Sequence, residues 1–171
     1  MEHCEQCGFV YDELPEHQIG RALRMLPAQY GTVLGIEDWR LRAHPIGGAW
    51  SALEYACHVR DIFHVQRERV EQALVEDEPS FEPMGRDDLV VSRRYNEQDP
   101  VSVEQQLTLN ARSLAELFEG LDPTQLARTA IYNYPTKAPR TIAWIGRHTV
   151  HEGRHHLRDM EHVIDAATPN E

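Results

Sequence analysis

The sequence lacks any apolar run approaching the roughly 20 residues that a membrane-spanning helix needs. Its first five residues also lack the basic and then apolar pattern that is typical of a secretion signal. Lysine and arginine total 17 against 28 acidic residues, with no dense basic cluster, so a net charge of −11 disfavours contact with a nucleic-acid backbone. We therefore expect a cytoplasmic protein with neither a membrane nor a nucleic acid as its partner.

Cysteine is also scarce, whereas histidine is abundant. Three cysteines, an odd number with two of them three positions apart, do not match the disulfide framework of a small secreted domain. The chain has 10 histidines, and five of them fall between His148 and His162. This contrast favours metal or redox chemistry over structural disulfides.

The periodicity of apolar residues predicts four long helices, and 171 residues with 41% hydrophobic content suit a single core. Ser51 and Glu54 have the spacing of a reciprocal capping box, and Asp99 before Pro100 suits another helix start. Pro27 should bend or divide the first helix because proline lacks a backbone donor. The four predicted segments are 14–34, 51–74, 100–120 and 141–167.

These segments predict an all-α fold, an antiparallel four-helix bundle with long loops between helices. Residues 77–99 are expected to form a long crossover with at most a short helix, and residues 122–140 a long loop or small hairpin. Because two of the connections are long, the sequence does not decide whether the helices follow a simple up-down-up-down order. We expect the bundle to span residues 14–167, preceded by a short Cys-x-x-Cys segment over residues 1–13.

Helical spacing singles out the histidines of the last predicted helix. Trp144 and the histidines at 148, 151, 155 and 162 should project from one side, toward the bundle interior. His151 and His155 form an i, i+4 pair whose imidazoles can chelate one ion, whereas His148, His156 and His162 are assigned packing roles. The second helix offers His58 as a third ligand.

Three histidine ligands would leave a coordination position open, which favours chemistry over a purely structural site closed by four ligands. Imidazole suits several divalent metals, of which zinc is the first expectation, with nickel or iron as alternatives. Carboxylates on the same helices could orient the ring N–H groups. The candidates for this supporting role are Glu54, Asp61, Glu152 and Asp159.

The segment Cys4-Glu5-Gln6-Cys7-Gly8 is half of a zinc-knuckle pattern. Cys4 and Cys7 could bind a metal, remain free thiols or form a redox pair. If they bind a metal, the segment could fold over the bundle and share an ion with its histidines, or it could form a site of its own. Cys57 is expected to be an inert, packed thiol.

Two stretches resemble the DinB-like, metal-binding four-helix bundles, a family similar to the bacterial thiol-dependent S-transferases. Residues 50–61 resemble the family's tryptophan-led helix start with its first histidine, and residues 151–159 resemble its H-x-x-x-H signature. The resemblance covers residues 14–166 in architecture and is specific in these two stretches. It implies the same three metal ligands, namely His58, His151 and His155.

The resemblance also implies an activity. Some relatives bind a low-molecular-weight thiol such as mycothiol or bacillithiol at the metal and transfer it to an electrophile, and a metal ion can equally activate water for hydrolysis. We expect a small-molecule substrate and a homodimer. The alternatives are a non-catalytic, stress-associated protein whose structural zinc is closed by Cys4 and Cys7, and a scaffold that has lost its metal site.

Overall fold

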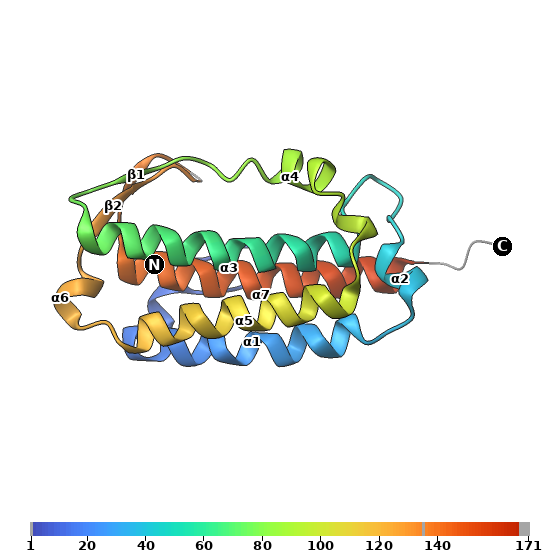
Figure 1. Ribbon diagram of the computed structural model, residues 1–171, viewed down its shortest axis with the longest axis horizontal. Helices are drawn as coiled ribbons and strands as arrows, with labels where there is room; N and C mark the ends of the chain where they lie inside the picture. The colour runs from blue at the N-terminus through green and yellow to red at the C-terminus, as the bar shows by residue number, and fades with distance from the viewer. Residues whose placement is uncertain (1, 135, 168–171) are drawn as a thin grey trace.

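The computed structural model describes residues 2–134 and 136–167, and four long helices lie side by side along its longest axis (Figure 1). Helix α1 contacts both α5 and α7, and α3 contacts the same two helices from the other side. The expected four-helix bundle is thereby confirmed. The helices are α1 (Ile19–Leu34), α3 (Ala52–Val75), α5 (Pro100–Glu119) and α7 (Ile142–Ala166).

The chain direction differs from a simple up-down-up-down order. Helices α1 and α7 run one way and α3 and α5 run the other, as the colour gradient shows in Figure 1. Because α3 and α5 are parallel neighbours, the chain between them must return along the length of the bundle. This crossover contains strand β1 (Ser80–Phe81), helix α4 (Arg86–Ser92) and the 3-10 turn Tyr95–Glu97.

The starts of the long helices follow their local sequence. The Ser51 side chain accepts from the Glu54 backbone N–H and the Glu54 carboxylate accepts from the Ser51 N–H, which confirms the predicted capping box. The Asp99 side chain caps α5 with Pro100 at its first turn, also as predicted. Pro27 lies inside α1 without dividing it, since apolar side chains around it are buried and hold the helix in place.

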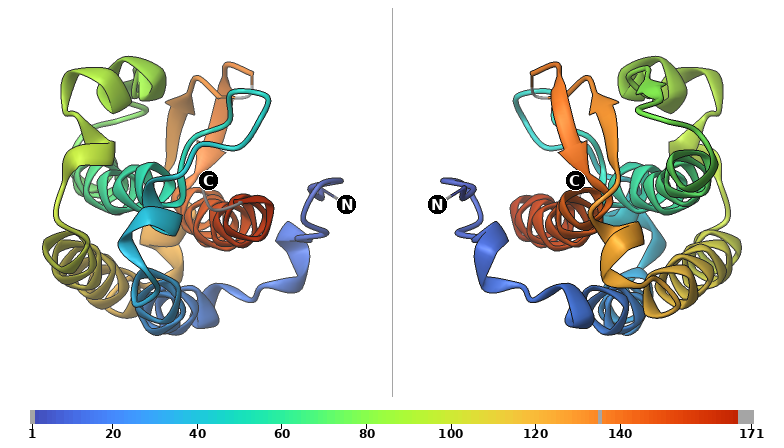
Figure 2. Two further views of the ribbon diagram at one scale, coloured as in Figure 1. Left: turned by 90° about the vertical axis from the view of Figure 1, so that its right-hand side faces the viewer. Right: turned by 90° about the vertical axis from the view of Figure 1, so that its left-hand side faces the viewer.

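Short strands beside the bundle form a small sheet that the sequence did not predict in full. Strand β2 (Thr129–Tyr132) pairs with β3 (Ala138–Thr141) in an antiparallel hairpin, which was one of the two expectations for this region. Strand β1 adds to β2 in parallel, with Ser80 opposite Ile131. Sheet and crossover stand on the same side of the bundle, above α3 and α7 (Figure 2). Short helices α2 (Asp38–Arg42) and α6 (Pro123–Leu126) complete the connections.

Helix α7 is held tightly against its neighbours. Its Gly146 lies where a Cβ atom would come within 2.6 Å of the Phe118 ring and 2.8 Å of the Ile19 side chain, so only glycine permits this approach. About two turns further on, the Tyr30 hydroxyl donates to the Gly153 carbonyl at 2.7 Å. These contacts fix the rotation of α7 and therefore the direction of its histidines.

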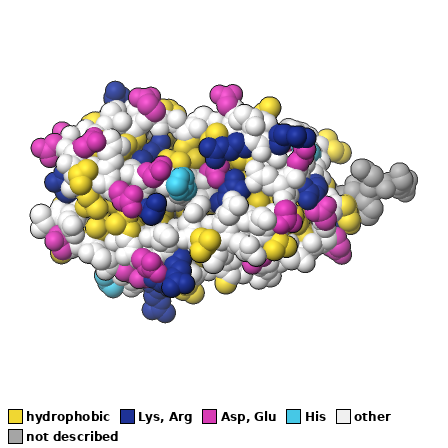
Figure 3. All heavy atoms as spheres, in the orientation of Figure 1, with side chains coloured by type: hydrophobic (Ala, Val, Ile, Leu, Met, Phe, Trp, Pro, Cys, Tyr) yellow, Lys and Arg dark blue, Asp and Glu magenta, His cyan; other side chains and the backbone are white. Residues whose placement is uncertain are grey.

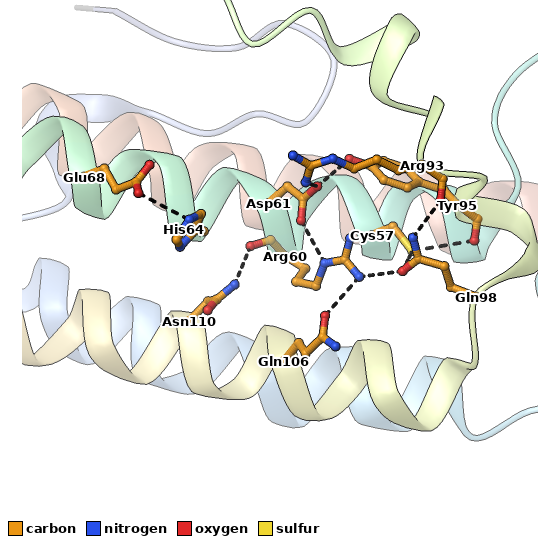
Figure 4. A network of polar contacts seen from close by, with 10 residues as sticks. All are labelled: Cys57, Arg60, Asp61, His64, Glu68, Arg93, Tyr95, Gln98, Gln106 and Asn110. Atoms are coloured by element: carbon orange, nitrogen blue, oxygen red, sulfur yellow. Dashed lines mark hydrogen bonds and ion pairs between the residues drawn. The ribbon is translucent and has the colours of Figure 1, made fainter. Parts of the chain in front are cut away.

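A buried ion-pair network joins α3, α5 and the crossover on another side of the bundle (Figure 4). Asp61 accepts from Arg60 Nε at 2.8 Å, from Arg93 at 2.8 Å and from the Tyr95 hydroxyl at 2.5 Å. Arg60 also donates to the Gln98 side chain. The network ties the returning chain to the middle of α3.

Two further findings bear on partners. None of the described helices is long and apolar enough to cross a membrane. On the face shown in Figure 3, basic and acidic side chains are interspersed rather than gathered into a field of one sign.

Candidate metal centre

The histidines of α7 do not all face the bundle interior. His148, His151 and His156 are buried and His155 is partly buried, but His162 is exposed, so the prediction of an inward-facing His162 was wrong. The neighbouring elements still cover α7 at this point, but they bury the next two residues, Val163 and Ile164, while His162 faces solvent. Among the described residues, four sets of side chains lie close enough to share an ion, and the two sets described next have no residue in common. The other two sets, His148 with His151 and Glu152 and His155 with His156 and Asp159, overlap both of them.

The first group consists of His58 from α3 with Glu152 and His156 from α7, and their ligand atoms lie within 4.8 Å of one another. His156 donates from Nδ1 to the Asp159 carboxylate at 2.9 Å. Its Nε2 is buried without a hydrogen-bond partner among the described residues and lies 3.5 Å from Glu152 Oε2. His58 Nδ1 is likewise buried and unpaired. A divalent cation would satisfy this set of groups.

The protonation states of the first group suit a cation. Burial, reinforced by the neighbouring His156, lowers the pKa of His58 to about 3, so this imidazole is neutral. Burial acts to raise the pKa of Glu152, but the neighbouring imidazoles of His151 and His156 hold it well below its usual value. Burial acts against a charged His156, yet Asp159 and Glu152 raise its pKa to about 8. The two carboxylates thus favour positive charge at His156, which a proton supplies in the absence of an ion and which a bound metal ion would supply by displacing that proton.

A cavity of about 400 Å³ opens beside the first group. His58, His148 and Glu152 contribute to its lining from the bundle side, while the crossover and the β2–β3 hairpin supply the opposite walls. Its volume lies in the range of small-molecule sites. Aromatic and cationic side chains in the lining are Phe81, Tyr132, Tyr134, Arg69 and Arg86.

The second group consists of Cys4, Cys7, His151 and His155, whose ligand atoms also lie within 4.8 Å of one another. The structure therefore separates His58 from His151 and His155, which the sequence had combined into one three-histidine site. The cause is helix rotation: adjacent residues point about 100° apart, and His156 rather than His155 turns toward α3. His155 turns toward the N-terminal segment instead.

The N-terminal segment reaches the second group through a tight turn. Cys4 and Phe9 pair through a backbone hydrogen bond of 2.9 Å, and Gly8 adopts a left-handed φ of +74° within the turn. Burial raises the pKa of the Cys4 thiol, but interactions with the Cys7 backbone amide and the His151 side chain outweigh it and bring the pKa to about 6. Cys4 is therefore largely a thiolate at neutral pH.

Tyr11 connects the N-terminal segment to α7 at His148 and His151. Its hydroxyl lies 2.9 Å from His148 Nδ1 and 3.2 Å from His151 Nδ1. Glu152 Oε1 also lies 3.1 Å from His151 Nδ1. His151 Nε2 is buried without a hydrogen-bond partner among the described residues, and it is the ring nitrogen left to serve as a ligand.

Three of the carboxylates predicted to support the histidines, Glu54, Asp61 and Asp159, lie in different surroundings. Asp159 does lie beside them, 2.9 Å from His156 Nδ1 and 3.6 Å from His155 Nε2. The Glu54 carboxylate instead accepts from the Ser51 backbone and lies 2.9 Å from His44 Nε2. Asp61 belongs to the arginine network of Figure 4. Of the three, Asp159 is placed to orient the site histidines.

The sequence analysis did not select Glu152 and His156 as ligands. These two residues have the same i, i+4 spacing as His151 and His155, with a carboxylate at the first position. That spacing was the available signal, but spacing alone cannot show which of two overlapping pairs faces the neighbouring helix. Cys57 meets expectation, because its thiol is fully buried and its pKa is raised to about 12 by that burial.

Comparisons with known proteins agree with this architecture. The family model described as the DinB superfamily matches residues 23–160. Among solved structures, the chain is similar to YfiT from Bacillus subtilis, which is described as a probable metal-dependent hydrolase with an unusual four-helix bundle topology. The TM-score is 0.80 at 18% identity, covering 95% of this chain and 91% of that one, so the likeness concerns the fold. No curated protein sequence matches the chain.

Proposed function

The chain belongs to the DinB superfamily, and from this premise we propose that it is a metal-dependent enzyme acting on a small molecule, with His58, Glu152 and His156 as the ligands of its catalytic ion. The observation that carries the proposal is the set of three side chains with ligand atoms within 4.8 Å of one another, in which His58 and His156 each have a buried ring nitrogen without a hydrogen-bond partner among the described residues. A buried polar atom without a partner costs about 1–3 kcal/mol, and a cation removes that cost. The adjoining cavity gives a substrate access to the same place.

The donor set favours hydrolysis as the reaction. Two imidazole nitrogens and one glutamate oxygen form the ligand set of several hydrolytic zinc sites, in which a position stays open for water or substrate. When bound, a divalent ion supplies Lewis acidity that makes water a competent nucleophile near neutral pH. Zinc is the expected metal, and the geometry also suits nickel or iron.

The residues of the chain prepare this site in three ways. Asp159 accepts from His156 Nδ1, which fixes the ring orientation and leaves Nε2 as the ligand atom. Burial keeps His58 neutral, the form that binds a metal. Stacking of His148 on Trp144, with ring centroids 4.7 Å apart, and its contact with Tyr11 hold the neighbouring cavity wall in place.

Thiol S-transfer is the second candidate reaction. The cavity of about 400 Å³ exceeds the space that water needs, so it has room for a low-molecular-weight thiol or an electrophile next to the ligands. An open coordination position can hold a thiolate as well as it can hold water. Mycothiol and bacillithiol are the thiols that the family resemblance suggests.

A purely structural role for the first group is less well supported. A structural zinc is normally enclosed by four protein ligands, whereas this group has three and lies at a cavity. The volume of that cavity supports the proposal of a small-molecule substrate. A homodimer and a cytoplasmic location stay predictions from the sequence.

Metal binding and activity should be measured together in matched variants. Metal-free protein is titrated with zinc, nickel and iron(II), and each form is assayed with chromogenic esters and amides and with an electrophile plus a small thiol. His58→Ala and His156→Ala should each lose one metal equivalent and the activity. His64→Ala on α3 and His162→Ala on α7 are the controls, because both side chains are exposed. Unchanged metal content and activity in His58→Ala and His156→Ala would refute the assignment.

A further inference from the structure

We propose that Cys4, Cys7, His151 and His155 bind a second divalent ion in a closed, structural site that fastens the N-terminal segment, residues 2–11, to α7. Two thiolate sulfurs and two imidazole nitrogens form a tetrahedral set that is typical of zinc. This group shares no residue with the proposed catalytic group. The inference therefore stands or falls independently of the proposed reaction.

The spacing of the ligand atoms fits one ion. Cys4 Sγ lies 3.7 Å from His155 Nδ1. Tetrahedral bonds of about 2.3 Å to sulfur and about 2.0 Å to nitrogen place two such ligands about 3.5 Å apart. The pair is thus near its bound separation before any rearrangement.

Each of the two imidazoles has one ring nitrogen available to bind the same ion. His151 Nδ1 is occupied by Tyr11 and Glu152, so its buried and unpaired Nε2 remains for the metal. His155 presents Nδ1 to Cys4, while its Nε2 lies 3.6 Å from the Asp159 carboxylate. A carboxylate behind a ligating imidazole is a recurrent feature of zinc sites. His151 is 8% exposed, which makes an unsatisfied nitrogen there costly.

The turn that carries Cys4 and Cys7 resembles the turn of a zinc knuckle. Gly8 N–H donates to the Cys4 carbonyl at 2.8 Å and closes the turn. Backbone amides of Gln6 and Cys7 interact with the Cys4 sulfur, and the Phe9 amide interacts with the Cys7 sulfur. These amides favour the thiolate, the form in which cysteine binds a metal, at Cys4. At Cys7 burial outweighs the Phe9 amide and raises the pKa of the thiol, which a metal ion would offset.

The proposed ion explains how a short segment is held on the outside of the bundle. Residues 2–11 run alongside α7 without a long helix of their own (Figure 2). Their polar contacts with α7 include Tyr11 with His148 and His151, and Trp144 Nε1 donating to Glu2 at 2.9 Å. A metal ion bound by Cys4, Cys7, His151 and His155 would hold Tyr11 in this position. The structural site thereby helps to position the α7 residues next to the catalytic group.

Cobalt(II) substitution tests the proposal directly. Protein loaded with cobalt should show an intense near-ultraviolet thiolate-to-cobalt band, which only a sulfur-ligated ion produces. The double variant Cys4→Ser with Cys7→Ser should lose this band and one metal equivalent, while keeping the equivalent bound at the first group. Cys57→Ser is the matched control, because the Cys57 thiol is buried elsewhere and should not affect the band. Retention of both equivalents and of the band by the double variant would overturn the proposal.

Two further measurements do not depend on the folding of the cysteine variant. His156→Ala removes a ligand of the first group only, so its remaining zinc should show sulfur and nitrogen scatterers in X-ray absorption, at about 2.3 and 2.0 Å. A shell of nitrogen and oxygen alone would contradict the site. In limited proteolysis, the wild type should be cut within residues 2–11 faster after a chelator has removed its metal. An unchanged cleavage rate would contradict the proposal that a metal ion fastens this segment to α7.

Discussion

The Asp159 carboxylate accepts a hydrogen bond of 2.9 Å from Nδ1 of His156. The same carboxylate oxygen lies 3.6 Å from His155 Nε2, so one side chain supports a ligand of each proposed metal site. Few positions on α7 could serve both groups, because the two histidines point to different neighbours. Asp159 therefore links two sites that otherwise share no residue.

Asp159→Asn should weaken metal binding at both groups. Loss of a carboxylate behind a ligating histidine typically costs 10- to 100-fold in metal affinity. Zinc affinity is measured at each site by competition with a chromogenic chelator, in a variant from which the ligands of the other site have been removed. Asp165→Asn, an exposed residue of the same helix, should leave both affinities unchanged. An effect confined to one site would show that Asp159 supports that site alone.

Tyr11→Phe should destabilise the protein by about 1–3 kcal/mol, because buried nitrogens of His148 and His151 lose their hydroxyl partner. The ring itself remains stacked on Trp144, so packing is preserved. Urea denaturation gives the free energy of unfolding. Tyr134→Phe is the control, since the Tyr134 side chain is 53% exposed. Equal stability of the two variants would argue against the bridging role of Tyr11.

Gly146→Ala should destabilise the bundle by about 1–3 kcal/mol, because the added methyl group meets the Phe118 ring at 2.6 Å. Gly31→Ala is the matched control in α1. There the nearest atom, also at 2.6 Å, is the end of the flexible Glu104 side chain, which can move aside. Thermal unfolding should show a lower Tm for Gly146→Ala and no loss for Gly31→Ala. An equal decrease in both would mean that helix separation does not depend on Gly146.

Asp61→Asn should cost about 3 kcal/mol at pH 7, since it leaves the buried Arg60 guanidinium without its charged partner. Burial acts to raise the pKa of Asp61, but Arg60 and Tyr95 hold it below its ordinary value of 3.8. The carboxylate therefore stabilises the fold fully above about pH 4, and this contribution is lost as the pH falls through the folded-state pKa.

The destabilisation by Asp61→Asn should accordingly shrink when unfolding is measured at progressively lower pH below 3.8. Asp12→Asn, at an exposed position, should stay within about 0.5 kcal/mol of the wild type throughout. A difference between wild type and Asp61→Asn that is independent of pH would show that the charge of Asp61 does not matter.

Local sequence signals predicted the helices well. The capping box of Ser51 and Glu54 and the start at Asp99 depend on contacts within four residues, which a sequence displays directly. Strand β1 has only two residues and pairs with β2 from far along the chain, so no local pattern marks it. The directions of the four helices likewise depend on the path of the crossover between α3 and α5, which no local pattern shows.

The composition of the site depended on contacts that sequence spacing cannot fix. His155 and His156 are adjacent, and the packing of α7 on Phe118, Ile19 and Tyr30 decides which of them faces α3. The metal-binding character of the region was evident from its histidines. The division into two groups could not be predicted, because it depends on the rotation of α7 and on the position of the N-terminal cysteines against it.

The central claim is that His58, Glu152 and His156 hold an ion at the cavity, and anomalous diffraction tests it most directly. Crystals of the zinc-loaded protein are measured on both sides of the zinc absorption edge. We predict an anomalous peak enclosed by these three side chains, with a second peak among Cys4, Cys7, His151 and His155. A zinc-loaded crystal without density at the first position, or with a single ion shared by His58, His151 and His155, would contradict the account.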